Sequence, residues 1–169
     1  MIITDIDNFL AYYSRIKGRT ERLFDYIPKD KIEWTYQSDK FTIGDILRHL
    51  ALIERKMYAE NVQLKPSLYK GCSIEYAVGY DEVIQFYKDM HRESVVIFST
   101  LTEPDLNSKC LTPGGAKITV WKWLRAMVEH EVHHRGQLYM YLVMLNIQPP
   151  PLYGLTAEEV ILRSEIEKK

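Results

Sequence analysis

One stretch of the chain, residues 128–142, restricts the possible folds more than any other. It reads V-E-H-E-V-H-H-R-G-Q-L-Y-M-Y-L and holds three of the five histidines, His130, His133 and His134. Because a helix turns about 100° per residue, His130 and His134 point only about 40° apart on one face. That face is otherwise apolar, so two imidazoles on it carry a desolvation cost unless a partner satisfies both. A divalent metal ion is such a partner, and this spacing lets one helix offer two imidazoles to one ion.

The apolar residues of the chain recur at spacings of three and four, which is typical of helices. The predicted helices span residues 3–27, 43–62, 80–101, 119–146 and 157–167. Thr42 with Asp45, and Thr156 with Glu159, are predicted capping boxes at the starts of the second and last helices. Strand signals are weak throughout. The sequence therefore predicts an all-α protein, a four-helix bundle with a short extra C-terminal helix, formed as a single domain by residues 1–169.

The second predicted helix carries a further histidine, His49, on its apolar stripe. Bundles build metal sites from side chains of facing helices, so His49, His130 and His134 form the predicted ligand set. Three neutral imidazoles leave a fourth position open to water or substrate, as in catalytic sites. Imidazole suits zinc and nickel, which are the divalent ions that we expect. His133 remains an alternative to His134, because it lies three residues and about 60° from His130.

The residues beside these histidines are candidates for a catalytic role. Residues 130–134 match the H-E-x-x-H pattern of zinc peptidases, in which the glutamate is the general base. The metzincin extension of that motif fails, because Gln137 and Met140 stand where a glycine and a histidine are required. We therefore expect Glu131 to flank the site or to make a hydrogen bond rather than to act as a base. Arg135 is a candidate for holding a substrate carboxylate, and the alternative is a structural ion pair.

Three other residues carry expectations about packing. Gly136 weakens a helix interior by about 1 kcal/mol relative to Ala, which indicates the close approach of another helix. Glu54 lies about 140° around the helix from His49, so we expect it to be solvated or interfacial. His91 lies on the inner face of the third predicted helix. We expect it to be packed or partly exposed, with proximity to the metal as the lesser alternative.

The overall composition excludes several classes of protein. The formal net charge is -1, and the basic residues are scattered, so no footprint for nucleic acid or an anionic membrane is present. The first seven residues lack the basic region of a signal peptide, and no apolar run approaches the roughly 20 residues that span a bilayer. Two isolated cysteines, Cys72 and Cys110, form no disulfide framework. We expect a cytoplasmic protein with a small-molecule substrate.

The sequence resembles the DinB/YfiT-like family of metal-binding four-helix bundles over nearly its whole length. The matching segments are H-E-V-H-H-R-G-Q-L at 130–138, D-I-L-R-H-L-A-L-I-E at 45–54, L-T-P-G-G at 111–115 and P-P-P-L-Y-G at 149–154. The resemblance implies a divalent metal held by His49, His130 and His134, and a homodimer. Characterised relatives include thiol S-transferases that use bacillithiol or mycothiol, and a mycothiol-dependent maleylpyruvate isomerase. No matched residue specifies the thiol.

Three hypotheses of different classes follow. The first is a metal-dependent enzyme, in which the ion activates a low-molecular-weight thiol for transfer to a small electrophile, or activates water for hydrolysis. The second is a non-catalytic protein that binds a metal or a small ligand. The third is a helical interaction protein whose core histidines are held by hydrogen bonds. An open coordination position beside a cavity favours the first hypothesis.

Overall fold

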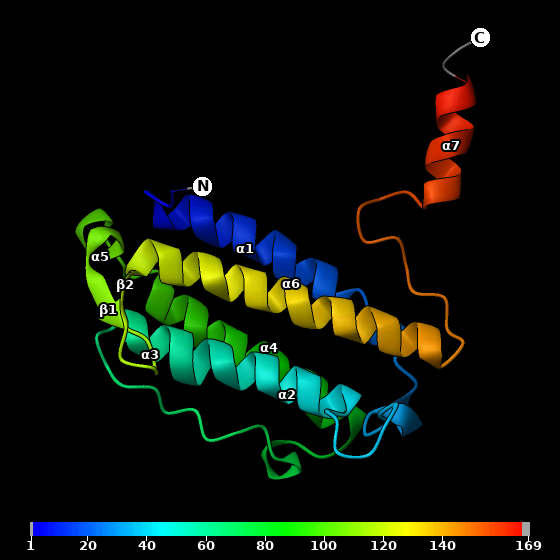
Figure 1. The fold of residues 1–169 in the computed structure, drawn as a ribbon, viewed down its shortest axis with the longest axis horizontal. Helices are drawn as coiled ribbons and strands as arrows, with labels where there is room; N and C mark the ends of the chain where they lie inside the picture. Colours follow the sequence, from blue (N-terminus) through cyan, green and yellow to red (C-terminus); the bar gives the residue numbers. More distant parts are fainter. Residues whose placement is uncertain (1, 167–169) are drawn as a thin grey trace.

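The computed structural model describes residues 2–166 and confirms the all-α prediction, with four long helical rods lying side by side (Figure 1). The helices are α1 (Ile6–Glu21), α2 (Ile43–Ile53), α3 (Ala59–Val62), α4 (Gly79–Phe98), α5 (Glu103–Asn107), α6 (Val120–Met144) and α7 (Ala157–Ile166). A π-helical turn, η3 (Glu54–Tyr58), joins α2 to α3 in one continuous rod. This rod packs on α4 and α6, while α1 packs on α6 and α4.

The ends of the helices follow from local capping chemistry. Thr42 and Asp45 form the predicted capping box of α2, in which each side chain accepts a hydrogen bond from the other residue's backbone N–H, at 2.9 and 3.0 Å. Thr156 and Glu159 form the second predicted box, at the start of α7. Asn146 ends α6 with a φ of 60°, a left-handed conformation that asparagine tolerates. The predicted last residue of α7, at position 167, lies outside the described residues.

The shorter elements lie between the long rods. Three 3-10 turns are present among residues 2–166, namely η1 (Phe24–Tyr26), η2 (Lys29–Lys31) and η4 (Ile74–Tyr76). A two-stranded antiparallel hairpin, β1 (Lys109–Leu111) and β2 (Lys117–Thr119), leads directly into α6. α7 has no buried residue and projects from the bundle (Figure 1). None of the described helices is long and apolar enough to cross a membrane.

The buried apolar side chains form two clusters, one at each end of the bundle. The first includes Phe9, Ile53, Phe98, Val120 and Leu124. The second includes Leu23, Ile46, Val83, Leu138 and Leu142. α4 and α6 each contribute to both clusters and carry buried polar residues between the two contributions. A belt of buried polar side chains, which also includes Lys17 of α1 and Glu54 of η3, lies near the place where the two clusters meet.

Lys17 of α1 is the centre of this belt. Its ammonium lies 3.0 Å from Glu54 Oε2 and 3.4 Å from Glu131 Oε2, and all three side chains are 2 % exposed. The second carboxylate oxygen of Glu131 accepts a hydrogen bond of 2.7 Å from the hydroxyl of Tyr87, on α4. The ammonium also lies 3.6 Å from the centroid of the Tyr87 ring. The belt thus ties α1, η3, α4 and α6 together through charged groups.

Of the two expectations for Glu54, the solvated one is wrong, because this carboxylate is buried in the belt at the interface of η3 with α1 and α4. It accepts hydrogen bonds from Tyr13 at 2.9 Å, from Lys17 at 3.0 Å and from His91 Nδ1 at 2.7 Å. Burial opposes ionisation of Glu54, but the charge of Lys17 and the hydrogen bond from His91 outweigh it and lower the pKa to about 2. The Glu54 carboxylate is therefore ionised inside the bundle.

Candidate metal centre

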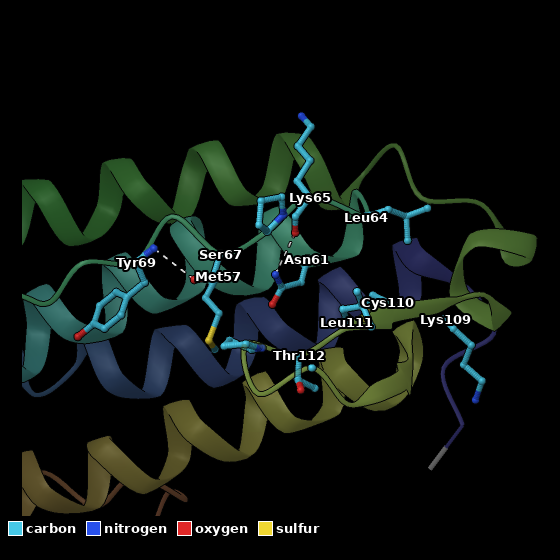
Figure 2. Close-up of a pocket in the computed structure, with 13 residues that line it drawn as sticks. Met57, Asn61, Leu64, Lys65, Ser67, Tyr69, Lys109, Cys110, Leu111 and Thr112 are labelled. Carbon is cyan, nitrogen blue, oxygen red and sulfur yellow. Dashed lines mark hydrogen bonds between the residues drawn. The ribbon is translucent and has the colours of Figure 1, made fainter.

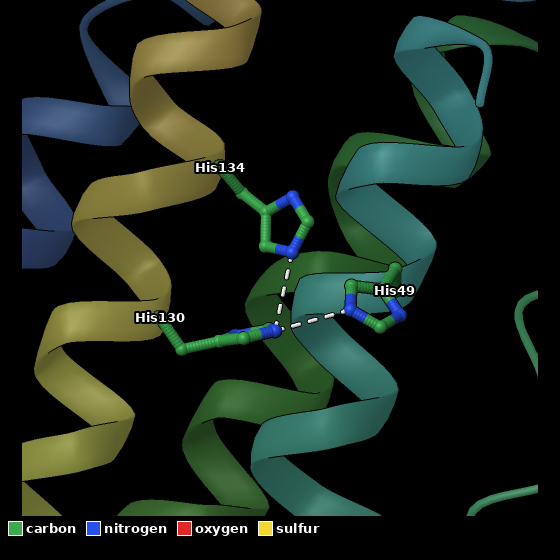
Figure 3. Close-up of side chains that lie close together, drawn as sticks. All are labelled: His49, His130 and His134. Atoms are coloured by element: carbon green, nitrogen blue, oxygen red, sulfur yellow. Dashed lines mark hydrogen bonds between the residues drawn. The ribbon is translucent and has the colours of Figure 1, made fainter. Parts of the chain in front are cut away.

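Three imidazoles from two adjacent helices converge where α2 faces α6 (Figure 3). Nε2 of His130 lies 3.1 Å from Nε2 of His49 and 3.1 Å from Nε2 of His134. One ring nitrogen from each of the three lies within 4.8 Å of the others. Zn–N bonds of about 2.0–2.1 Å at tetrahedral angles place two ligand nitrogens about 3.3 Å apart, so two of the three separations already approach those of ligands to one ion.

The outer ring nitrogens of two of these histidines have their own partners. Nδ1 of His49 lies 2.7 Å from the hydroxyl of Tyr69, and Nδ1 of His134 lies 2.7 Å from Oε1 of Gln137. An amide oxygen only accepts, so Nδ1 of His134 carries the proton and its Nε2 presents a lone pair. Such contacts orient metal-binding histidines and fix their tautomers. His49 and His134 are thus held with Nε2 directed at the centre.

Burial and mutual repulsion keep these imidazoles neutral. Burial, together with the charge of His134, lowers the pKa of His49 to about 4. Burial and the neighbouring histidines lower the pKa of His130 to about 3. Burial also lowers the pKa of His134, although its hydrogen bond to Gln137 opposes the shift. Metal coordination requires neutral imidazole, so the site favours the protonation state that a ligand must have.

The donor set fits a cation better than it fits hydrogen bonds alone. Because Nε2 of His134 is an acceptor, only one of the two 3.1 Å contacts can be a hydrogen bond, whichever tautomers His49 and His130 adopt. One ring nitrogen is then left without a partner in a partly buried site, which costs free energy. A single divalent ion would accept all three lone pairs. His49, His130 and His134 would hold that ion.

The two remaining histidines lie outside this group. His133 is exposed, and its Nε2 lies 3.3 Å from Nε2 of Gln137, so the structure directs His134 rather than His133 toward His130. His91 is hydrogen-bonded to Glu54 in the buried belt. It is packed and partly exposed, and it is not part of the histidine group.

The two catalytic candidates from the sequence both point away from the three imidazoles. Glu131 lies in the buried belt, bound to Lys17 and Tyr87, so its carboxylate is already engaged on another side of α6. Arg135 is 3 % exposed and donates to the backbone oxygen of Ile16 at 3.2 Å and to the hydroxyl of Tyr153 at 3.1 Å. Arg135 thus ties α1 to the chain that follows α6, and neither candidate faces the centre.

A cavity of about 790 Å³ opens beside the centre, between α6 and the loop before α2. His133, His134, Gln137 and Tyr141 of α6 line one side, and Tyr36 and Phe41 of the loop before α2 line the other. The space is large enough for a small molecule to approach the histidines. Gly136 also lines it, and no heavy atom of residues 2–166 lies within 4 Å of a Cβ placed there. The expectation that another helix approaches Gly136 closely is therefore wrong for the helices of this part of the chain.

Sequence reasoning missed Tyr69, which contacts the outer nitrogen of His49. This tyrosine lies in the long connection between α3 and α4, where no periodic pattern predicts which side chains turn inward. Gln137 was considered only as a departure from the peptidase motif. Its position three residues after His134 is one helical turn away, and that spacing is the signal for its contact.

Comparisons with known proteins agree with this fold. A family model described as the DinB superfamily matches residues 12–138. Among solved structures, a DinB-like protein from Bacillus cereus has a TM-score of 0.73 at 19% identity, covering 89% of this chain and 99% of that chain. A DinB-like protein from Bacillus subtilis has a TM-score of 0.67 at 20% identity, covering 87% and 97%.

A more distant likeness is to a variant of the mycothiol-dependent maleylpyruvate isomerase. It has a TM-score of 0.62 at 11% identity, and the match covers 79% of this chain and 60% of that chain. No curated protein matches the sequence. The family model spans most of the chain and includes His49, His130 and His134. The chain therefore belongs to the DinB superfamily.

Proposed function

We propose that the protein binds one divalent ion, zinc or nickel, through His49, His130 and His134, and that it is a metal-dependent enzyme. The proposed reaction transfers a low-molecular-weight thiol to a small electrophile. The observation that carries the proposal is the convergence of three neutral imidazoles. Nε2 of His130 lies 3.1 Å from Nε2 of His49 and 3.1 Å from Nε2 of His134. Three protein ligands leave a position for substrate, which is the composition of a catalytic rather than a structural site.

A divalent ion held by His49, His130 and His134 would lower the pKa of a thiol bound beside it, so that the thiol would lose its proton to solvent and react as the nucleophilic thiolate. The protein residues orient the site for this chemistry. Tyr69 and Gln137 hold two imidazoles in place, and the cavity beside His134 admits the substrate. The thiolate sulfur forms the new bond to the electrophilic carbon, and the leaving group departs with its electron pair. The fold is shared with a mycothiol-dependent enzyme, which supports a thiol as co-substrate.

The placement of Glu131 argues against hydrolysis of a peptide. A metal-dependent peptidase requires a general base beside its water, and the glutamate of the H-E-x-x-H match is buried against Lys17 and Tyr87 instead. A metal-dependent hydrolase of another type and a non-catalytic metal-binding protein remain the alternatives. The experiments that follow distinguish them.

Elemental analysis of untagged protein tests the ligand set. We expect about one divalent ion per chain, and we expect His49→Ala and His130→Ala each to lose most of it. His133→Ala is the matched control, because this exposed histidine lies on the same helix but outside the group, and it should keep the ion. Full occupancy in both of the first two variants would contradict the proposed site.

The reaction is tested by following a model electrophile with bacillithiol, mycothiol, glutathione or cysteine, before and after chelation. We expect consumption that requires both a thiol and the metal. Thiol-independent turnover that survives chelation would contradict the proposal. Thiol-independent turnover that is lost on chelation would identify a metal-dependent hydrolase, and metal binding without turnover would identify a binding protein.

We also propose that the protein is a cytoplasmic homodimer that binds neither nucleic acid nor a membrane. The resemblance in sequence and the commonness of two-fold dimers support this assembly. α7 adds a structural reason, because four of its apolar side chains are 48–65% exposed, namely Val160, Ile161, Leu162 and Ile166. Sedimentation that shows only monomer at micromolar concentration would contradict the dimer.

A further inference from the structure

A second cavity, of about 780 Å³, lies between the chain that follows α3 and the β1–β2 hairpin (Figure 2). Residues 64–69 form one wall and residues 109–115 the other, with Met57 of η3 between them. Most of the lining surface is apolar. Of the thirteen described residues that line it, none is acidic. The cavity therefore suits a largely apolar molecule and offers no carboxylate to a cation.

Asn61 provides a buried hydrogen-bond acceptor in this cavity. It is 2 % exposed, and its Nδ2 donates to the backbone oxygen of Lys65 at 3.1 Å. This bond fixes the amide orientation, because the reverse orientation would place two acceptors together. Oδ1 has no hydrogen-bond partner within residues 2–166. Figure 2 shows this oxygen on the side away from Lys65, toward the space between Met57 and Thr112. A buried acceptor without a donor is uncommon, and a ligand hydroxyl or N–H would satisfy it.

Two lysines give the rim of the cavity a positive charge. The ammonium of Lys65 contacts Gln63 at 2.9 Å, and that of Lys109 contacts Thr119 at 2.7 Å, so both partners are neutral. Across the described part of the chain, neither lysine forms a salt bridge. Figure 2 shows Lys65 and Lys109 on different sides of the margin, both directed outward. Their charge is available to an anionic group that stays at the rim in water.

We propose that this cavity binds a small amphiphilic organic acid. Its apolar body lies against Met57 and Leu111, its hydroxyl or N–H donates to Oδ1 of Asn61, and its carboxylate stays at the rim near one of the two lysines, Lys65 or Lys109. Tyr69 lines the same cavity and contacts Nδ1 of His49, so the ligand lies beside the histidine group without ligating an ion. Because none of these contacts involves a metal, the binding is measured on chelator-treated, full-length protein.

The donor contact is tested with two probes of nearly equal shape, ω-hydroxydecanoate and undecanoate, by titration calorimetry. We compare the ratio of their dissociation constants in wild type and in Asn61→Leu. A neutral hydrogen bond contributes about 1 kcal/mol, so we expect the preference for the hydroxy acid to fall about fivefold in the variant. An unchanged ratio would overturn the assignment of Asn61. Because both probes are measured on each protein, a general change in the shape of the cavity affects both constants and leaves the ratio intact.

The site and its charge preference are tested at Leu111, which lines the cavity and is 55% exposed, so its replacement leaves the core intact. We expect Leu111→Asp to weaken ω-hydroxydecanoate at least tenfold and Leu111→Asn to weaken it much less. Lys65→Met combined with Lys109→Met should also weaken it severalfold, whereas the exposed Lys88→Met on α4 should not. Equal affinities in Leu111→Asp and wild type, or no binding to wild type at millimolar concentration, would overturn the proposal. Loss of the metal site would leave all of these results unchanged.

Discussion

At the scale of single residues, Lys17 is the side chain on which two buried carboxylates depend. Its ammonium contacts the buried carboxylates of Glu54 and Glu131 at 3.0 and 3.4 Å. Lys17→Met leaves two carboxylates without this cation, and breaking a buried pair in this way costs roughly 3–5 kcal/mol. We expect that loss in the free energy of unfolding measured with urea. Adding Glu54→Gln and Glu131→Gln should restore part of it. A loss below about 1 kcal/mol in the single variant would contradict the role of the belt.

The lowered pKa of Glu54 predicts how the free energy of unfolding depends on pH. In the unfolded chain its carboxyl group takes up a proton near pH 4.5, whereas in the folded protein its pKa is about 2. The unfolded state therefore binds more protons across this interval, and the contribution of Glu54 to stability is present above pH 4.5 and lost as the pH falls toward 2. One such group changes the free energy of unfolding by at most about 1.4 kcal/mol per pH unit.

Urea unfolding between pH 5.5 and 3.5 measures this dependence. We expect Glu54→Gln to be less stable than wild type at pH 5.5, and to lose stability less steeply as the pH falls. Asp105→Asn is a suitable comparison, because the pKa of Asp105 is lowered by exposed hydrogen bonds to Thr102 rather than by buried charge. Parallel curves for wild type and Glu54→Gln would show that Glu54 does not govern the acid response.

At the scale of helices, the sequence predicted the four long helices and two capping boxes, because those depend on local spacing. It did not predict that the Glu54 carboxylate is buried, although the helical angle was correct. The expectation assumed that each helix buries one face, whereas nearly every residue of α2 is buried and α6 contacts both α1 and the rod of α2. A position opposite the histidines therefore faces another helix instead of water. Only the packing of all four rods decides this.

The histidine group itself was predictable because two of its members share one helix. The separation of His130 from His134 follows from helical geometry. The inclusion of His49 in the group follows from its position on the apolar stripe of its own helix. The contact of Tyr69 with His49 was not predictable, since it depends on how the irregular segment after α3 folds back. Hydrogen bonds from Leu68 to the backbone of Lys56 and from Asn61 to the backbone of Lys65 hold that segment against the rod.

Two glycines in helices should respond in opposite ways to substitution by alanine. A Cβ at Gly136 meets no heavy atom within 4 Å, so Gly136→Ala should stabilise α6 by up to about 1 kcal/mol. A Cβ at Gly44 would lie 2.7 Å from Oε1 of Glu33 and 3.0 Å from Nη1 of Arg48. Those two atoms form an ion pair of 2.8 Å, so Gly44→Ala should destabilise the protein by about 1 kcal/mol.

Thermal unfolding of the two variants measures this contrast. The comparison is informative because the chemical change is the same in both helices and only the surroundings differ. The melting temperature of Gly136→Ala should lie above that of wild type, and that of Gly44→Ala should lie below it. A destabilised Gly136→Ala would mean that this position has a close neighbour after all, for example in a dimer.

At the scale of the whole molecule, the proposed metal would add a direct crosslink between two rods that packing and the buried belt already join. His49 belongs to the rod of α2, and His130 and His134 belong to α6, so an ion bound to all three would crosslink them in the middle of the bundle. The unfolded chain has no such preformed site, so binding should stabilise the folded state by mass action. At a free metal concentration about a hundred times the dissociation constant, the gain is about 2.7 kcal/mol.

For a chain of this length, 1 kcal/mol raises the melting temperature by about 2–4 °C, so metal addition to chelated protein should raise it by roughly 5–10 °C. Calorimetry of wild type with and without zinc or nickel measures the shift. His130→Ala should lose the shift, because His130 is the residue whose Nε2 lies 3.1 Å from both of the others. His133→Ala should keep it. An equal shift in His130→Ala and wild type would place the stabilising ion elsewhere in the molecule. The absence of a shift in wild type would mean that the three imidazoles do not bind the ion tightly enough to act as one site.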